Sequence, residues 1–267
     1  MKSNSSKTIT ALLFIMLQSS FALSAQTGSP QQKGLWVAEQ IDRADEGFVN
    51  QVSKAIMTLR NKQGQQSIRS MTIKSLEVDG DGDKSLTIFS SPRDVKGTAF
   101  LSFTHALEPD DQWLFLPALK RVKRISSNNK SGPFMGSEFA YEDISSQEVE
   151  KYTYSYLREE EVLGAKGYVI ERVPVDKKSG YTKQVVWVDG THWRLGKIEF
   201  YDRKNEKLKT LTFEDYMQYS NKKWRSRRME MMNHQTGKST QLTWSDIKFG
   251  QDLTVRDFDQ NALKRVR

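Results

Sequence analysis

The chain is organised around residues 91–144, which read SPRDVKGTAFLSFTHALEPDDQWLFLPALKRVKRISSNNKSGPFMGSEFAYEDI. In this stretch, apolar runs of strand length are interrupted by Pro117, and a Gly/Ser-rich segment carrying Phe134 and Met135 follows. Proline cannot donate to a sheet ladder, so Pro117 indicates a bend or a change of strand. The stretch therefore predicts strands on both sides of Pro117 and a short, partly helical lid over residues 134–144.

The flanking sequence alternates with a period of two, as β-strands do. Ala55, Met57 and Leu59 alternate with polar neighbours, and Met71 and Ile73 lie on one side of the next run. Short turns rich in Gly, Asn and Asp separate the runs and leave no room for crossover helices. We expect three strands between residues 48 and 89, followed by strands at 98–107, 113–125 (broken at Pro117), 147–163, 167–175, 182–189, 193–201, 207–219, 223–233 and 239–248.

Two helices are expected at the ends of this run of strands. Residues 34–47 carry Val37 and Ile41 at helical spacing, which predicts one stripe packed on the core. A membrane-surface helix is the alternative, but its other face is acidic and anionic lipid would repel it. The closing helix is expected to contain Phe258, Ala262, Leu263 and Val266.

These elements predict a mainly β fold, in which about 11–12 antiparallel strands form a curved sheet with a concave face that must be filled. Several strands carry Met and Phe, which form an adaptable apolar surface suited to acyl chains. The alternative is an ordinary core filled by the two helices. The candidate cavity residues are Met57, Leu59, Met71, Ile73, Phe100, Trp113, Phe115, Phe213 and Met217.

Residues 1–25 have the order of a secretory signal, with Lys2 and Lys7 before a short apolar run and small residues leading to Ala25. The run is much shorter than the ~20 apolar residues of a membrane-spanning helix. We expect cleavage near Ala25, one domain over residues 26–267, and a periplasmic protein with only transient membrane contact.

The chain is basic and lacks cysteine, so no disulfide, thiolate nucleophile or lipidated cysteine is available. The net charge is +8, and removal of Lys2 and Lys7 leaves +6. In an exported protein this charge points to anionic head groups or acidic protein partners rather than nucleic acid. The candidate contacts are Lys120, Arg121 and Arg124; the alternative is a solvated strand face.

Catalytic and metal-binding patterns are weak. His105, His192 and His234 lie on different predicted strands or turns without a metal-binding spacing. The run 79–83 places carboxylates at alternate positions, as a calcium loop does, but Lys84 and Ser90 stand where that loop needs Gly and Glu. A hairpin turn is the better interpretation. The sequence predicts a protein that is not an enzyme and holds no cofactor or metal.

Three segments of the central stretch together resemble the outer-membrane lipoprotein-sorting family. They are 91–101 (SPRDVKGTAFL), 113–125 (WLFLPALKRVKRI) and 134–143 (FMGSEFAYED). The family consists of LolA-like periplasmic proteins, some of which are found beside exporters of the resistance-nodulation-division (RND) type. The residues that match its pattern are Gly97, Phe100, Leu101, Leu116, Pro117, Arg124, Phe134, Met135, Gly136 and Asp143.

The resemblance implies an unclosed antiparallel β-barrel with helices over its concave face, holding a lipid or the acyl chains of a lipoprotein for transfer toward the outer membrane. It also implies an arginine on an early strand that holds the lid shut, for which Arg60 is the candidate. An RND-type exporter is the implied partner. A periplasmic adaptor that binds an exporter and carries nothing is the alternative function.

Overall fold

The structure is a computed structural model that describes residues 28–219 and 222–265. The expected export signal, residues 1–25, lies outside these described residues. Within them, no helix is long and apolar enough to cross a membrane.

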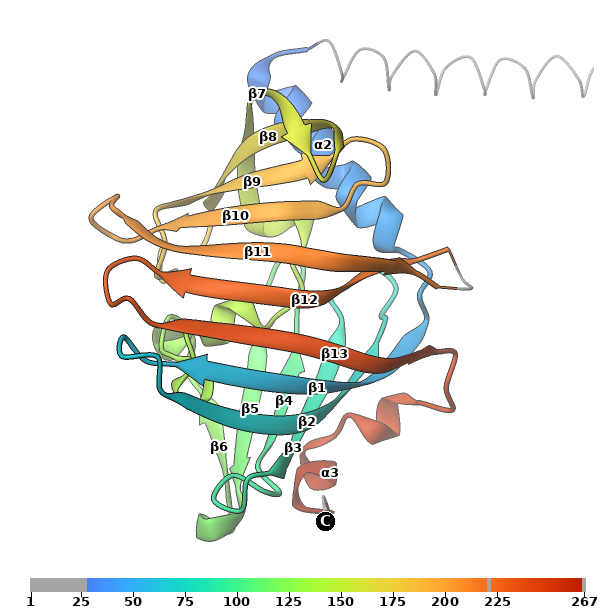
Figure 1. The fold of residues 1–267 in the computed structure, drawn as a ribbon. Coiled ribbons are helices and arrows are strands. Elements are labelled where there is room, and N and C mark those ends of the chain that lie inside the picture. Colours follow the sequence, from blue (N-terminus) through green and yellow to red (C-terminus); the bar gives the residue numbers. More distant parts are fainter. Residues whose placement is uncertain (1–27, 220–221, 266–267) are drawn as a thin grey trace, which may run out of the picture.

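Thirteen strands form one antiparallel sheet in the order β6-β5-β4-β3-β2-β1-β13-β12-β11-β10-β9-β8-β7 (Figure 1). The strands are β1 (Asn50–Arg60), β2 (Gln66–Leu76), β3 (Lys84–Ser91), β4 (Ala99–Phe103), β5 (Asp111–Leu116), β6 (Arg121–Ile125), β7 (Tyr152–Val162), β8 (Ala165–Pro174), β9 (Lys183–Asp189), β10 (Leu195–Tyr201), β11 (Lys207–Gln218), β12 (Trp224–Asn233) and β13 (Ser239–Phe249). This confirms the predicted mainly β, unclosed fold, with slightly more strands than expected.

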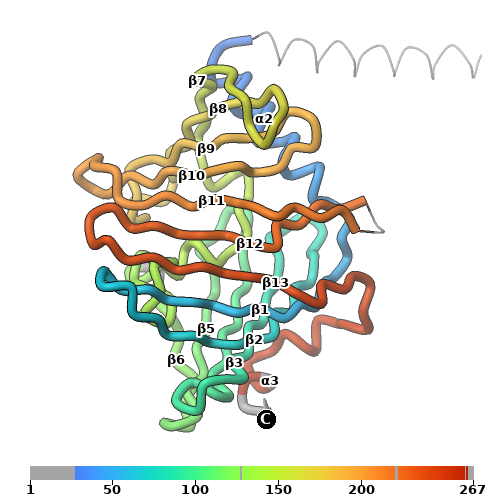
Figure 2. The backbone as a smooth tube through the Cα atoms, in the orientation of Figure 1, coloured from blue at the N-terminus to red at the C-terminus, as the bar shows by residue number. Residues whose placement is uncertain are grey.

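The first and last strands of the chain are neighbours in the middle of the sheet, because β1 pairs with both β2 and β13 (Figure 2). The edge strands β6 and β7 are therefore consecutive in sequence, and residues 126–151 connect them. We call residues 126–151 the lid segment. It contains the 3-10 turns Ser127–Asn129, Phe134–Gly136, Tyr141–Asp143 and Val149–Lys151.

The two faces of the sheet bury different clusters, as the period-two alternation requires. Phe100 of β4 belongs to the large cluster on the concave face, which includes Phe134 and Phe139 of the lid segment. Its neighbour Leu101 faces the convex side, where Phe258 and Leu263 cover it. Leu263 belongs to helix α3 (Gln260–Arg265), whereas Phe258 precedes it and Val266 lies outside the described residues.

Helix α2 (Pro30–Asp45) packs on β7 and β8 with the stripe that the sequence predicted. Ser29 caps it, accepting a hydrogen bond from the Gln32 backbone N–H. Gly34 lies so close to β7 that an added Cβ would come within 2.8 Å of the Ser155 backbone. Val37 is buried in the concave cluster and Ile41 packs against it, which confirms the core-facing interpretation.

Candidate functional site

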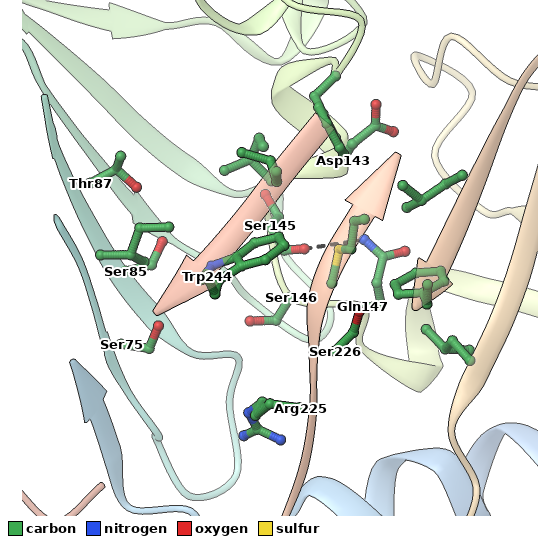
Figure 3. Close-up of a pocket in the computed structure, with 18 of the residues that line it drawn as sticks. Ser75, Ser85, Thr87, Asp143, Ser145, Ser146, Gln147, Arg225, Ser226 and Trp244 are labelled. Atoms are coloured by element: carbon green, nitrogen blue, oxygen red, sulfur yellow. Dashed lines mark hydrogen bonds between the residues drawn. The ribbon is translucent and has the colours of Figure 1, made fainter. Parts of the chain in front are cut away.

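A cavity of about 390 Å³ lies between the lid segment and the concave face of the sheet (Figure 3). This volume is near the lower end of the ~300–1,000 Å³ range of small-molecule sites. Strands from both halves of the sheet supply its apolar lining. These lining residues are Met57, Met71, Ile73, Leu195, Ile198, Phe200, Leu211, Phe213, Met229, Leu242, Trp244 and Ile247.

The lining is also partly polar. Ser75 and Ser85 line it from β2 and β3, Ser146 from the lid segment, and Ser226 from β12 (Figure 3). A plain hydrophobic core would not need hydroxyl groups on facing walls. The cavity therefore matches an amphipathic ligand better than a pure hydrocarbon.

Phe134 of the lid segment lines the cavity. It is 1% exposed and its ring lies 5.1 Å from Phe100 and 5.6 Å from Tyr141, centroid to centroid. The next two residues, Met135 and Gly136, have φ values of 51° and 73°. Glycine tolerates this left-handed conformation without strain, which explains why the turn contains Gly136.

A buried ion pair fastens the lid segment to β11. Lys209 Nζ lies 2.7 Å from Asp143 Oδ2, and the two side chains are 5% and 4% exposed. Tyr181 donates its hydroxyl to Asp143 Oδ1 at 2.8 Å, and the Ala140 backbone N–H donates to Oδ2 at 2.6 Å. Every charge in this group thus has a partner, as burial requires.

Further polar contacts tie the lid segment to the loop between β8 and β9 and to strands β2 and β13. Glu142 accepts hydrogen bonds from Ser179 Oγ and the Gly180 N–H at 2.8 and 2.9 Å, and burial raises its pKa. The Glu138 N–H donates to Thr240 Oγ1 on β13 at 3.0 Å. Arg69 of β2 donates to the carbonyl of Met135. The lid segment is therefore held from β2, from β11 and from β13.

Two carboxyl groups near helix α2 are partly buried. Burial raises the pKa of Asp83 to about 6, with a further contribution from the negative charges of Asp45 and Glu77. Burial likewise raises the pKa of Glu148 to about 7, and the charge of Asp83 adds to this effect. Asp83 also lines the cavity. Protonation near these pKa values therefore changes the charge beside the cavity.

Four of the candidate cavity residues line the cavity: Met57, Met71, Ile73 and Phe213. Leu59 and Phe100 belong to the same concave cluster without lining the cavity. That any of these residues binds a ligand stays a prediction.

Trp113, Phe115 and Met217 were placed wrongly by the sequence. Trp113 and Phe115 face the convex side in the cluster with Phe258. Both faces of β5 are apolar, so alternation alone could not tell which is concave. Met217 is 45% exposed, because the backbone at Asp215, with φ of 54°, departs from regular strand geometry, and Tyr216 rather than Met217 packs against the concave cluster.

The motif residues fall into two groups. Phe134, Met135, Gly136 and Asp143 belong to the lid segment. Leu101 is buried on the convex face, and Gly97 has φ of 80° with its α-carbon facing Pro117, whose ring atoms would lie 3.7 Å from an added Cβ. These last three shape the hairpins of β3 to β6 rather than the lid.

The candidate contact cations lie at the edge strand β6. Lys120 and Arg121 are exposed, and Lys120 adopts φ of 49° in the turn after Pro117. Lys120 therefore precedes β6, which begins at Arg121. Arg124 is exposed and forms an ion pair with Asp111. A role in partner contact stays a prediction.

The lid arginine was misassigned, and other site residues were missed. Arg60 faces away from the lid segment, toward Glu230 and Gln241, whereas Arg69, nine residues along, reaches it. Lys209 and Arg225, which line or border the cavity, were not singled out. The alternation of Lys209 with Leu211 and Phe213, which places it on the apolar side of β11, was the available signal for Lys209.

The three histidines occupy separate places. His105 Nδ1 lies 2.8 Å from Asp81 of the 79–83 turn, and His234 Nε2 lies 2.7 Å from Thr210 Oγ1. His192 packs against the ring of Trp224. In the described part of the chain, no group of three or more potential ligands is placed to hold a metal.

The unclosed sheet with a lid segment over its concave face defines a LolA-like fold, and comparison with known proteins agrees. A solved outer membrane lipoprotein-sorting protein domain from Vibrio parahaemolyticus is 58% identical, with a TM-score of 0.86, over 88% of this chain and 100% of that chain. A DUF1329 family protein from Desulfovibrio piger is 30% identical with a TM-score of 0.83 and the same coverage. This chain belongs to the outer-membrane lipoprotein-sorting family.

More distant comparisons are consistent with this. A LolA superfamily protein from Nitrosomonas europaea, 22% identical with a TM-score of 0.69 over 88% of this chain and 100% of that chain, shares the fold. A family model described only as an uncharacterized protein matches residues 81–265. No curated protein matches the chain.

Proposed function

We propose that this protein is a periplasmic carrier that binds a lipid or the acyl chains of a lipoprotein in its cavity and passes them toward the outer membrane, acting with an RND-type exporter. One observation carries the proposal: a Met- and Phe-lined cavity lies beneath a segment that polar contacts fasten to the sheet. Such contacts can be exchanged for water when the segment moves, because both partners are polar.

Burial of an acyl chain supplies the binding energy for this function. Each methylene group removed from water contributes about 0.8 kcal/mol, so one long chain is sufficient for stable binding. Met57, Met71 and Met229 are unbranched and can adapt to chains of different shape. The 58%-identical relative is described as a lipoprotein-sorting protein, which supports this assignment.

The direct test is to purify the protein, extract it with organic solvent and analyse the extract by mass spectrometry. We expect a lipid in stoichiometric amount, or binding of a fluorescent fatty acid by the stripped protein. A protein that is empty and also fails to bind the fatty acid would contradict the carrier function.

Adjacent residues of β1 provide a matched pair of variants. Met57 is fully buried and lines the cavity, whereas Ile56 is 47% exposed on the other face. Met57→Gln should weaken fatty-acid binding by about tenfold, since it places an amide against the acyl chain. Ile56→Gln should leave binding unchanged. Equal effects of the two substitutions would show that the ligand does not occupy this cavity.

A non-carrying exporter adaptor is the second candidate, and the exposed cations Lys120 and Arg121 beside the edge strand favour it. Reversing the charges of Lys120, Arg121 and Arg124 should then abolish binding to the exporter, while Met57→Gln leaves it intact. If the protein is a carrier, Met57→Gln should weaken lipid binding, and the charge reversals should leave lipid binding intact.

A further inference from the structure

Arg225 stands at the mouth of the cavity in an organised setting. Its side chain is 18% exposed, and its guanidinium lies over the rings of Phe48 and Phe249, 5.5 and 5.2 Å from their centroids. Its Nε donates to Gln51 Oε1 at 2.9 Å. The guanidinium is therefore fixed in orientation before any ligand arrives.

The carboxylate that pairs with Arg225 is weakly held. Asp45 contacts Nη1 of Arg225, yet its side chain is 54% exposed. Asp45 is also the last residue of α2, where the negative end of the helix dipole disfavours an acid. An ion pair whose carboxylate is this exposed contributes little stability. Asp45 can therefore yield its place to another anion at low cost.

Arg225 borders the apolar interior directly. It lines the same cavity as Met57, Met71 and Phe213, with the hydroxyls of Ser75 and Ser226 also in the lining (Figure 3). A ligand with its chain among the apolar residues would thus place its polar end beside the guanidinium. Arginine recognises carboxylate and phosphate groups through paired hydrogen bonds.

We propose that Arg225 is the head-group site for an anionic, single-chain amphiphile, whose carboxylate or phosphate takes the place of Asp45. This inference rests on the proposed carrier function and names its ligand class. A single chain suits the small volume of the cavity, about 390 Å³.

The other charged residues of the lining are consistent with an anionic head group. Asp143 is neutralised by Lys209. Arg172 is 8% exposed and is held by the amides of Gln184 and Gln147, so it adds a second positive charge to the lining. Asp83 opposes an anion, but burial raises its pKa to about 6, which lowers its negative charge in mildly acidic solution.

The test compares oleate with oleyl alcohol, which has the same chain and no charge. Arg225→Gln should weaken oleate binding about tenfold and leave oleyl alcohol binding unchanged, because only the anion loses a charge-assisted contact. Arg228→Gln is the control: Arg228 lies on the same strand, where it is exposed and pairs with Glu214. It should change neither affinity. Dissociation constants are measured by calorimetry, with a thermal melt of each variant.

Asp45→Asn provides a second variant on an exposed side chain. Removing the competing carboxylate should tighten oleate binding severalfold, and lysophosphatidic acid should respond like oleate if the site accepts phosphate as well as carboxylate. A response of oleate alone would restrict the site to carboxylates.

The outcomes separate the two proposals. If the wild-type protein binds neither oleate nor oleyl alcohol, the carrier function and the head-group site both fail. If both ligands bind but Arg225→Gln weakens them equally, or Asp45→Asn weakens oleate, the carrier function stands and the head-group site is overturned.

Discussion

The buried ion pair between Lys209 and Asp143 holds the lid segment on β11. Lys209→Met would leave the Asp143 carboxylate buried with Tyr181 and the Ala140 N–H as its remaining hydrogen-bond donors. Leaving a buried charge without its counter-ion costs about 3–5 kcal/mol. We therefore expect Lys209→Met to lower the free energy of unfolding by about 3 kcal/mol, measured by urea denaturation.

An exposed pair in the same sheet gives the matched control. Lys54 Nζ lies 2.8 Å from Asp246, and the two side chains are 70% and 56% exposed. Lys54→Met should change the free energy of unfolding by no more than about 0.5 kcal/mol. If the two substitutions cost the same, the contact between Lys209 and Asp143 does not stabilise the fold.

Asp83 gives the protein a pH-dependent stability. Its pKa is raised from an ordinary 3.8 to about 6 by burial, followed by the charges of Asp45 and Glu77, while hydrogen bonds from Val78 and Ser146 act in the opposite direction. A raised pKa in the folded state means that folding favours the protonated carboxyl. The contribution of Asp83 to the free energy of unfolding is complete below about pH 4 and is lost as the pH rises through 6.

We therefore expect the free energy of unfolding to fall between about pH 4 and pH 7, by up to about 3 kcal/mol from this group. Glu148, whose pKa is raised to about 7 by burial and by Asp83, acts in the same direction over a higher range. Urea titrations at several pH values measure the slope. Asp83→Asn should flatten it, and an unchanged slope in that variant would exclude Asp83 as its source.

At the scale of elements, the lid segment depends on contacts from strands that are distant in sequence. Arg69 of β2 donates to the Met135 carbonyl, and burial lowers the pKa of its guanidinium. Arg69→Leu should speed hydrogen exchange of lid amides such as Phe134 and Tyr141 by about tenfold, since a hydrogen bond to a charged group is lost. Hydrogen-exchange mass spectrometry measures the change.

Arg60→Leu is the control for this prediction, because Arg60 contacts Glu230 and Gln241 instead of the lid segment. In the Arg60→Leu variant, the lid amides should exchange at the wild-type rate. Faster exchange in Arg60→Leu, or no change in Arg69→Leu, would show that Arg69 does not hold the lid.

The sequence predicted the secondary-structure elements more completely than the directions in which their side chains point. Period-two alternation predicted the strands and the inward positions of Met57 and Met71, since both lie in regular strands. It failed after Asp215, because the φ of 54° at this residue interrupts the regular strand and leaves Tyr216 rather than Met217 against the concave cluster. An irregularity of this kind has no reliable signal in the alternation itself.

At the scale of the whole molecule, the sequence predicted a curved sheet but not which face is concave. Phe100 faces the cavity side and Trp113 faces α3, although both are aromatic residues of short buried strands. The distinction arises because the lid segment covers one face and the C-terminal residues cover the other. Likewise, contacts such as Arg225 with Asp45 join residues 180 apart, which local patterns cannot reveal.

The arrangement of mouth and lid leads to a prediction about cargo size. We expect a single chain to enter the existing cavity beside Arg225, whereas a ligand with several chains, larger than about 390 Å³, should require the lid segment to leave the sheet. The chain has no native cysteine, so one engineered disulfide would be its sole cross-link. Glu138 and Thr240 suit it, because the Glu138 N–H donates to Thr240 Oγ1 at 3.0 Å.

We expect the oxidised Glu138→Cys/Thr240→Cys protein to exchange oleate at the wild-type rate. It should bind a triacylated lipopeptide at least about tenfold more weakly, because the additional acyl chains cannot be buried while the disulfide holds the lid segment on the sheet. Reduction of the same sample should restore lipopeptide binding, and each single cysteine variant should behave as wild type. If the oxidised protein binds the lipopeptide normally, larger cargo reaches the cavity without displacement of the lid segment.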